Sequence, residues 1–274
     1  MTDIVEKNRR DWEGYSERYM AFNLSDSVLE RLKARPESAF APAVWAMLRE
    51  YLPELEGKRV CVPSSGDNHA VLAFALMGAR VTSCDISQNQ LAAAKAAAEK
   101  LGLGDRAAFQ QEDTMRLDGI EDGAYDLVYT SNGVHVWLND LPSMYQNIHR
   151  ILKPGGLYVM YELHPFQRPF GEGLKAVKPY DSTGPFEDET TVSFAWRIQD
   201  IVNPILDAGI RLMRMEEIMP KPDYEHPFFV KNEEIVNGRR LSREEVGAMY
   251  DWRQNPAAAL PEMIALVGRR DGQG

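Results

Sequence analysis

The sequence predicts an α/β fold: a Rossmann-like, doubly wound sheet of seven mostly parallel strands, with an antiparallel strand at one edge. From Lys58 onward, short apolar runs alternate with helical runs, an order typical of a parallel sheet covered by helices on both faces. Right-handed crossovers then give the doubly wound arrangement. The last two apolar runs have no helix of core type between them, which favours an antiparallel pair at the sheet edge.

The N-terminal residues 1–52 are predicted to form a helical cap segment. In residues 38–52, "SAFAPAVWAMLREYL", apolar side chains recur at spacings of three and four, as one face of a helix requires. Ahead of this run, Trp12, Tyr15, Tyr19 and Phe22 share one helical stripe. Such a stripe packs onto the core or, alternatively, forms an aromatic cap over a ligand.

The remaining elements follow in a regular order. Strands are expected at 58–64, 79–87, 106–113, 125–133 and 157–166, with helices at 68–78, 88–103 and 141–156. A helix at 197–209 and strands at 210–218 and 262–270 complete the pattern. The alanine-rich run 88–103 needs little tertiary support to be helical. "KPGG", which ends the run 141–156, is expected to stop that helix.

Two irregular stretches interrupt the pattern, at about 167–195 and 220–260. Both are rich in proline, glycine and charged residues, which indicates long loops or lids. We therefore expect the cap segment 1–52 and one α/β domain, 53–274, that carries both insertions.

Composition narrows the function classes. The chain has 274 residues, 44% hydrophobic and 26% charged, and a net charge of -10, so it lacks the basic surplus that nucleic-acid binding requires. No run approaches the roughly 20 apolar residues of a membrane span, and the N-terminus has no apolar signal core. We expect a cytoplasmic protein with a small-molecule partner. Cys61 and Cys84 fall in apolar runs and are expected to be buried thiols rather than a disulfide or metal site.

The turn after the first strand is the candidate cofactor loop, because ligands of open parallel sheets bind beyond the carboxyl ends of the strands. This turn, Pro63 to His69, contains a single glycine, Gly66. Small residues, and Asn68 at a positive φ, can replace the usual glycines. Asp67 places a negative charge near the helix N-terminus, which favours a cofactor without phosphates.

Two carboxylates follow the next strands. Asp85 ends the second strand, 19 positions after Gly66, where a carboxylate accepts hydrogen bonds from both hydroxyls of a ribose. Asp113 follows the third strand, where a carboxylate can accept from the amino group of adenine. The alternatives are a helix N-cap for Asp85 and a loop or capping role for Asp113.

The order "VCVPSSGDNHAVLAFALMGARVTSCDIS", "QQEDTMRL", "YDLVYTSNGVHVWL" and "ILKPGGLYVM" resembles class I S-adenosylmethionine-dependent methyltransferases, in particular the small-molecule group called methyltransferase type 11 or UbiE-like. The resemblance covers about residues 58–165. It implies S-adenosylmethionine as cofactor and S-adenosylhomocysteine as product. It also implies that the first loop holds the methionine part and ribose, Asp85 the ribose, and Asp113 the adenine, and that 131–135 line the methyl-transfer face.

The candidate cofactor residues are the positions that match this family, with two tyrosines of the possible aromatic cap. They are Tyr15, Tyr19, Pro63, Ser64, Ser65, Gly66, Asn68, Asp85, Ile86, Asp113, Thr114, Met115, Ser131, Asn132 and Gly133. The first loop departs from the family, whose pattern of an acid and three glycines falls here on Val62, Ser64, Gly66 and Asn68. Asp67, a backbone carbonyl near Pro63 or Asn132, or an N-terminal tyrosine are the candidates to replace the missing acid.

Methyl transfer is an in-line displacement that needs positioning and, for hydroxyl-like acceptors, a base. The candidate bases are His135 and His164, just past the fourth and fifth strands. These histidines could converge with Glu162 and His226 on a metal, but no short helical ligand motif is present, so no metal is predicted.

The function predicted is S-adenosylmethionine-dependent methyl transfer to a small-molecule acceptor, by a monomer or homodimer. One alternative is a protein that binds S-adenosylmethionine or S-adenosylhomocysteine without catalysis, because the first loop is altered. A nicotinamide-dependent oxidoreductase is a further alternative, but it requires a tighter glycine pattern to admit a pyrophosphate.

Overall fold

The computed structural model describes residues 3–221 and 241–272, and for residues 15–22 and 172 it describes the backbone alone. Seven strands form one sheet: β1 (Arg59–Val62), β2 (Arg80–Asp85), β3 (Ala107–Gln111), β4 (Tyr125–Ser131), β5 (Leu152–Leu163), β8 (Ile210–Ile218) and β9 (Met263–Arg270). Their order is β3-β2-β1-β4-β5-β9-β8. The first five strands are parallel, and β9 runs antiparallel to both β5 and β8. The predicted fold class, with an antiparallel pair at one edge, is confirmed.

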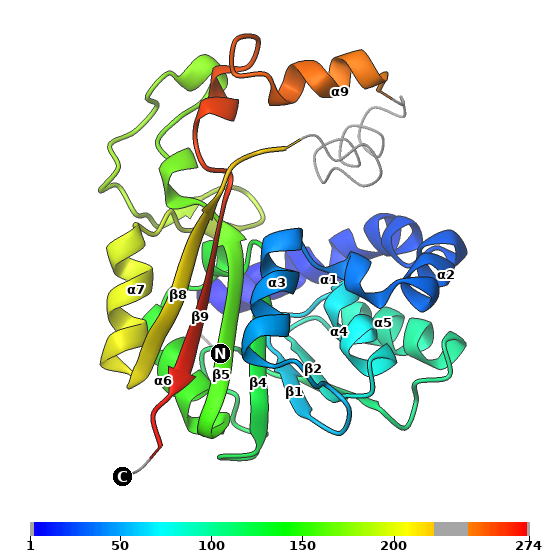
Figure 1. Ribbon diagram of the computed structural model, residues 1–274. Helices are drawn as coiled ribbons and strands as arrows, with labels where there is room; N and C mark the ends of the chain where they lie inside the picture. The colour runs from blue at the N-terminus through cyan, green and yellow to red at the C-terminus, as the bar shows by residue number, and fades with distance from the viewer. Residues whose placement is uncertain (1–2, 222–240, 273–274) are drawn as a thin grey trace.

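Helices cover both faces of the sheet (Figure 1). The helices are α1 (Asp3–Asn23), α2 (Asp26–Ala34), α3 (Pro42–Tyr51), α4 (His69–Leu76), α5 (Gln88–Lys100), α6 (Leu141–Ile151), α7 (Ile198–Asp207) and α9 (Arg243–Tyr250). Short 3-10 turns lie at η1 (Pro36–Ala39), η2 (His135–Trp137), η3 (Pro165–Gln167), η4 (Glu172–Leu174) and η5 (Pro256–Ala259). No helix in the described ranges is both long and apolar enough to cross a membrane.

The core is divided by the sheet into two apolar clusters. Because side chains alternate along a strand, Leu127 and Tyr129 of β4 pack with α2, α3 and α4 on one face. Val128, between them, packs with α6 and α7 on the other face. In Figure 1, α2 of the first group lies at the right and α7 of the second group at the left.

The predicted boundary between the helix at 141–156 and the strand at 157–166 is wrong. The helix expected at 141–156 ends at Ile151, and β5 already begins at Leu152, which pairs with Tyr125. Pro154 cannot continue the hydrogen-bond ladder of a helix, so the chain leaves the helix before it. "KPGG" therefore lies within the start of the strand.

The first insertion and the described part of the second lie beyond the same end of the sheet, at the top of Figure 1. The first contains η3, η4 and a small hairpin of β6 (Phe186–Glu187) and β7 (Val192–Ser193). In the second, α9 and η5 lie in the described part. The two insertions touch, since η4 contacts η5 and the Gln167 side chain donates to the Pro261 carbonyl at 2.9 Å.

Candidate active site

The loops after β1, β3 and β4 are tied together by side-chain hydrogen bonds at one rim of the sheet. Ser64 Oγ lies 2.7 Å from Thr114 Oγ1, which joins the first loop to the loop after β3. Asn68 Nδ2 donates to the carbonyl and hydroxyl oxygens of Ser131, both at 2.9 Å, which joins the first loop to the end of β4. Ser65 Oγ contacts Ser83 Oγ at 2.7 Å and anchors the loop to β2. Most of the predicted cofactor residues thus lie together.

Asp85 is the central carboxylate of this rim. It is 8% exposed, and its two oxygens accept the backbone N–H groups of Gly66 and Ser87, each at 2.8 Å. Burial raises the pKa of Asp85 to about 6, against the effect of these hydrogen bonds, which lower it. Each carboxylate oxygen can still accept from a further donor. The helix N-cap of α5, the alternative role for Asp85, is Ser87, whose hydroxyl accepts from Gln90 N.

The first loop turns at two residues in the left-handed region, Ser64 with φ 46° and Gly66 with φ 50°. A Cβ added at Gly66 would lie 2.2 Å from Gln90 Oε1, so both the angle and the space favour glycine here. The expectation of a positive φ at Asn68 is wrong: its φ is -62°, and its side chain caps α4 by accepting from Ala70 N. A non-glycine residue held at positive φ, as Ser64 is, is uncommon.

Asp113 is half-buried, and burial raises its pKa. Its Oδ1 accepts from Met115 N at 2.9 Å, which fixes the loop after β3. Within the described ranges no donor contacts its Oδ2. Asp85 and Asp113 therefore both offer acceptor atoms, and ribose hydroxyls and an adenine amino group are donors. The two carboxylates thus offer acceptors that match the donors of an adenosine-containing cofactor.

Helix α1 spans the rim from the end of β4 to the first loop. The Glu13 carboxylate accepts the N–H groups of Gln88 and Asn89 at the start of α5, at 2.9 and 3.1 Å. At the end of α1, Asn23 Nδ2 donates to Asp67 Oδ2 at 2.7 Å. Asp67 is thereby engaged with α1. Sequence reasoning missed Glu13 and Asn23 because it followed only the aromatic stripe of this helix.

The aromatic stripe is described in part. Trp12 meets Trp137 edge to face, with ring centroids 5.4 Å apart. The side chains of Tyr15 and Tyr19 lie outside the described residues, so the proposed aromatic cap stays a prediction. Asn8, 1% exposed, donates to the Val192 carbonyl at 2.9 Å and accepts from Val192 N at 2.8 Å, which joins α1 to β7.

Glu162 holds the turn that follows β4. Its carboxylate accepts the N–H groups of Gly133, Val134 at 2.8 Å, His135 at 3.1 Å and Leu163 at 2.9 Å. The side chain is 3% exposed. Four converging N–H groups stabilise the buried negative charge, so Glu162 positions the 131–135 segment.

Both predicted bases are buried. His135 is 4% exposed; its Nε2 lies 2.9 Å from the Tyr145 hydroxyl, and its Nδ1 has no hydrogen-bond partner among the described residues. His164 is fully buried, with Nε2 2.9 Å from Glu217 Oε1 and Nδ1 accepting from Phe166 N. Burial lowers the pKa of both imidazoles, which favours their neutral forms. Their role as bases stays a prediction.

In residues 3–221 and 241–272, no group of three histidine, cysteine, aspartate or glutamate side chains is arranged to hold a metal ion. His226, one member of the metal set considered from the sequence, lies outside the described residues. Cys61 and Cys84 are free and buried.

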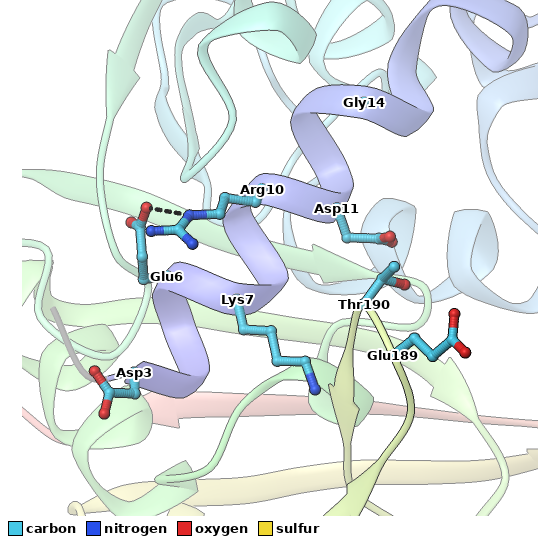
Figure 2. Close-up of a pocket in the computed structure, with 8 residues that line it drawn as sticks. All are labelled: Asp3, Glu6, Lys7, Arg10, Asp11, Gly14, Glu189 and Thr190. Carbon is cyan, nitrogen blue, oxygen red and sulfur yellow. Dashed lines mark hydrogen bonds and ion pairs between the residues drawn. The ribbon is translucent and has the colours of Figure 1, made fainter.

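A hollow of about 720 Å³ lies between α1 and the turn of the β6–β7 hairpin (Figure 2). Its lining carries four carboxylates and two cations and consists of Asp3, Glu6, Lys7, Arg10, Asp11, Gly14, Glu189 and Thr190. None of the predicted cofactor residues lines it. The Arg10 guanidinium pairs with Glu6 at 3.1 Å within it (Figure 2).

Comparisons with known proteins agree with this geometry. Residues 63–160 match a methyltransferase domain family. An uncharacterized methyltransferase of Synechocystis is 30% identical over 166 residues, which cover 58% of this chain and 69% of that protein. A sterol 24-C-methyltransferase of Gibberella zeae is 39% identical over 85 residues, or 31% of this chain, and the match spans only 22% of that relative's length. A crystal structure of an S-adenosylmethionine-dependent methyltransferase from Mesorhizobium loti has a TM-score of 0.60 at 22% identity, covering 84% of this chain and 99% of that one.

Proposed function

Because the chain belongs to the class I S-adenosylmethionine-dependent methyltransferases, we propose that it transfers the methyl group of S-adenosylmethionine to a small-molecule acceptor by in-line displacement. The observation that supports this most is the rim built around Asp85. A buried carboxylate keeps acceptor capacity there, between a first loop and an α5 N-terminus that both donate to it.

The roles of individual residues follow from their chemistry. We propose that Asp85 binds the ribose hydroxyls and Asp113 Oδ2 the adenine amino group. Ser64, with Thr114, and Asn68, with Ser131, hold the first loop at the spacing that the cofactor needs. The bound cofactor supplies an electrophilic methyl group on a sulfonium. The chain contributes position and exclusion of water, since α1 and the turn held by Glu162 border the rim.

A second candidate is binding of S-adenosylmethionine without methyl transfer. The specific observation that favours it is the burial of both His135 and His164, which leaves neither imidazole exposed to accept a proton from an acceptor. Methyl transfer to a strong nucleophile needs no base, so this observation does not contradict the first proposal.

The deciding experiment is calorimetry of the full chain with S-adenosylmethionine, S-adenosylhomocysteine and NAD. We expect the two sulfur compounds to bind and NAD not to bind. Binding of NAD alone would contradict the methyltransferase proposal. Incubation with methyl-labelled S-adenosylmethionine and a panel of acceptors then separates transfer from binding alone, because only transfer moves label to a second molecule.

Asp85 is tested by Asp85→Ala. We expect this variant to bind S-adenosylhomocysteine more weakly by on the order of 1–3 kcal/mol, because the ribose hydroxyls lose their charged acceptor. The matched control is Asp105→Ala, which removes an exposed carboxylate from a turn before β3. If circular dichroism shows that Asp85→Ala is folded and its affinity for S-adenosylhomocysteine is unchanged, Asp85 does not belong to the site.

A further inference from the structure

Arg168 lies beside the ends of β4 and β5, where it lines a small cavity with His135 and Glu162. Arg168 follows η3 directly, at the start of the first insertion. In the part of the chain that the structure describes, its guanidinium makes no hydrogen bond or ion pair. The side chain is only partly exposed, and burial lowers its pKa. A half-exposed guanidinium that pairs with none of the described side chains has its hydrogen-bond donors available to a ligand.

The Glu162 carboxylate does not pair with the Arg168 guanidinium. Its negative charge favours the charged guanidinium, but its oxygens are occupied by four backbone N–H groups and it forms no ion pair with Arg168. The carboxylate is therefore committed to the turn after β4.

The same insertion carries a second cation, Lys178, whose ionisation is affected by the charge of Arg168. Burial lowers the pKa of Lys178, and the positive charge of Arg168 lowers it further. The Lys178 ammonium lies 3.6 Å from the centre of the Phe186 ring, a contact that holds it in place. The two positive charges repel each other, and a bound anion offsets this repulsion. The pair therefore favours a negatively charged ligand.

Arg168 also lines a small cavity at the end of β5. The cavity has a volume of about 10 Å³, room for about one water molecule. His135, Glu162, Phe194 and Trp196 line it as well, and the last two rings are stacked with centroids 5.3 Å apart. His135 adds a buried Nδ1 with no hydrogen-bond partner among the described residues. A polar recess thus lies against an aromatic wall, on the side where a parallel sheet binds its ligands.

We propose that Arg168, supported by Lys178, binds an oxyanion group of the methyl acceptor, so that the acceptor is an organic anion with a carboxylate or phosphate. This inference rests on the proposed function. The planar guanidinium pairs with two oxygens of such a group, and the ammonium acts as a point charge.

The test is calorimetry of the full chain, with and without saturating S-adenosylhomocysteine, using benzoate, phenyl phosphate and neutral benzamide as probes. We expect at least one anion to bind about tenfold or more tightly than benzamide, because charge-assisted hydrogen bonds are lost with the neutral probe. The two anions distinguish a carboxylate from a phosphate. This comparison uses the wild-type chain, so it does not depend on a variant that folds.

The variants are Arg168→Gln, Arg168→Lys and Lys178→Gln, with Lys175→Gln as the matched control, an exposed lysine of the same insertion. We expect Arg168→Gln to weaken the binding of whichever anion binds the wild-type chain more tightly by about tenfold or more. Lys178→Gln should weaken the binding of the same anion about threefold. Arg168→Lys should keep part of the affinity, and Lys175→Gln should change it less than twofold.

Three outcomes would overturn the inference. Neither anion binds more tightly than benzamide, or Arg168→Gln binds the anions with the affinity of the wild-type chain, or Arg168→Gln loses affinity for S-adenosylhomocysteine and not for the probes. The last result would assign Arg168 to the cofactor. Failure of the proposed function is distinguishable, because wild-type chain would then not bind S-adenosylhomocysteine, whatever the probes do.

Discussion

Among single residues, Asp85 connects burial with cofactor binding through its ionisation. Its pKa of about 6 belongs to the protein without cofactor. In the proposed complex, ribose hydroxyls donate to the ionised carboxylate, so binding favours loss of the proton and the affinity rises with pH. We expect the affinity for S-adenosylhomocysteine to increase about tenfold between pH 5 and pH 7 and to level off above pH 7. Calorimetry across this range checks it; Asp85→Ala should lack the rise, and a pH-independent wild type would contradict the prediction.

Glu162 gives a second prediction for one residue, on stability. Glu162→Gln keeps one acceptor oxygen but turns an amide donor toward backbone N–H groups that already converge there. We expect the free energy of unfolding to fall by on the order of 1–3 kcal/mol, measured by urea denaturation. Glu187→Gln, an exposed position in β6, should change it by less than about 0.5 kcal/mol. Equal stability of both variants would mean that the turn after β4 does not depend on this charge.

What the sequence predicts of the site depends on how each residue is specified. Asp85 and Asp113 were predictable because their place at strand ends follows from the order of elements. The directions in which the His135 and His164 side chains point were not predictable. A side chain at the end of a strand can face the rim or the interior, and packing, which buries both histidines, decides between them. The positive φ of Ser64 was also hidden, because a serine carries no signal for that conformation.

At the scale of elements, α1 is held to the rim by a few polar contacts. Glu13→Ala removes the acceptor for two N–H groups at the start of α5 and a negative charge that suits a helix N-terminus. We expect amide hydrogen exchange in α1 to accelerate roughly five- to thirtyfold, while exchange in β9 is unchanged. Glu30→Ala on the exposed face of α2 is the control. Uniform acceleration in both elements would indicate global destabilisation instead of release of α1.

Element types were predictable from periodicity, and boundaries less so. Each strand and helix predicted between residues 58 and 166 is present, in the predicted order. The predicted end of α6 is wrong because proline and glycine indicate a stop only at 154–156, whereas the pairing of Leu152 with Tyr125 starts the strand earlier. Such pairing joins residues far apart in sequence, so local composition does not contain it.

At the scale of the whole molecule, the first loop of the proposed cofactor site joins elements that are far apart in the sequence. The first loop contacts α1 through Asp67, β2 through Ser65 and β4 through Asn68. A ligand that binds the folded rim in preference to the unfolded chain therefore stabilises contacts among segments between residues 23 and 131.

Ligand stabilisation gives the last prediction. At a free S-adenosylhomocysteine concentration 100 times its Kd, the folded state gains about 2.7 kcal/mol, which corresponds to a rise in Tm of roughly 5–10 °C for a chain of this size. Differential scanning calorimetry measures the shift, with NAD at the same concentration as the control. Asp85→Ala should show a smaller shift at equal ligand concentration, because its Kd is larger and the free ligand then exceeds it by a smaller factor. A rise with NAD equal to that with S-adenosylhomocysteine would contradict a rim built for the sulfur cofactor, since it would indicate binding to a nucleoside without regard to the rest of the molecule.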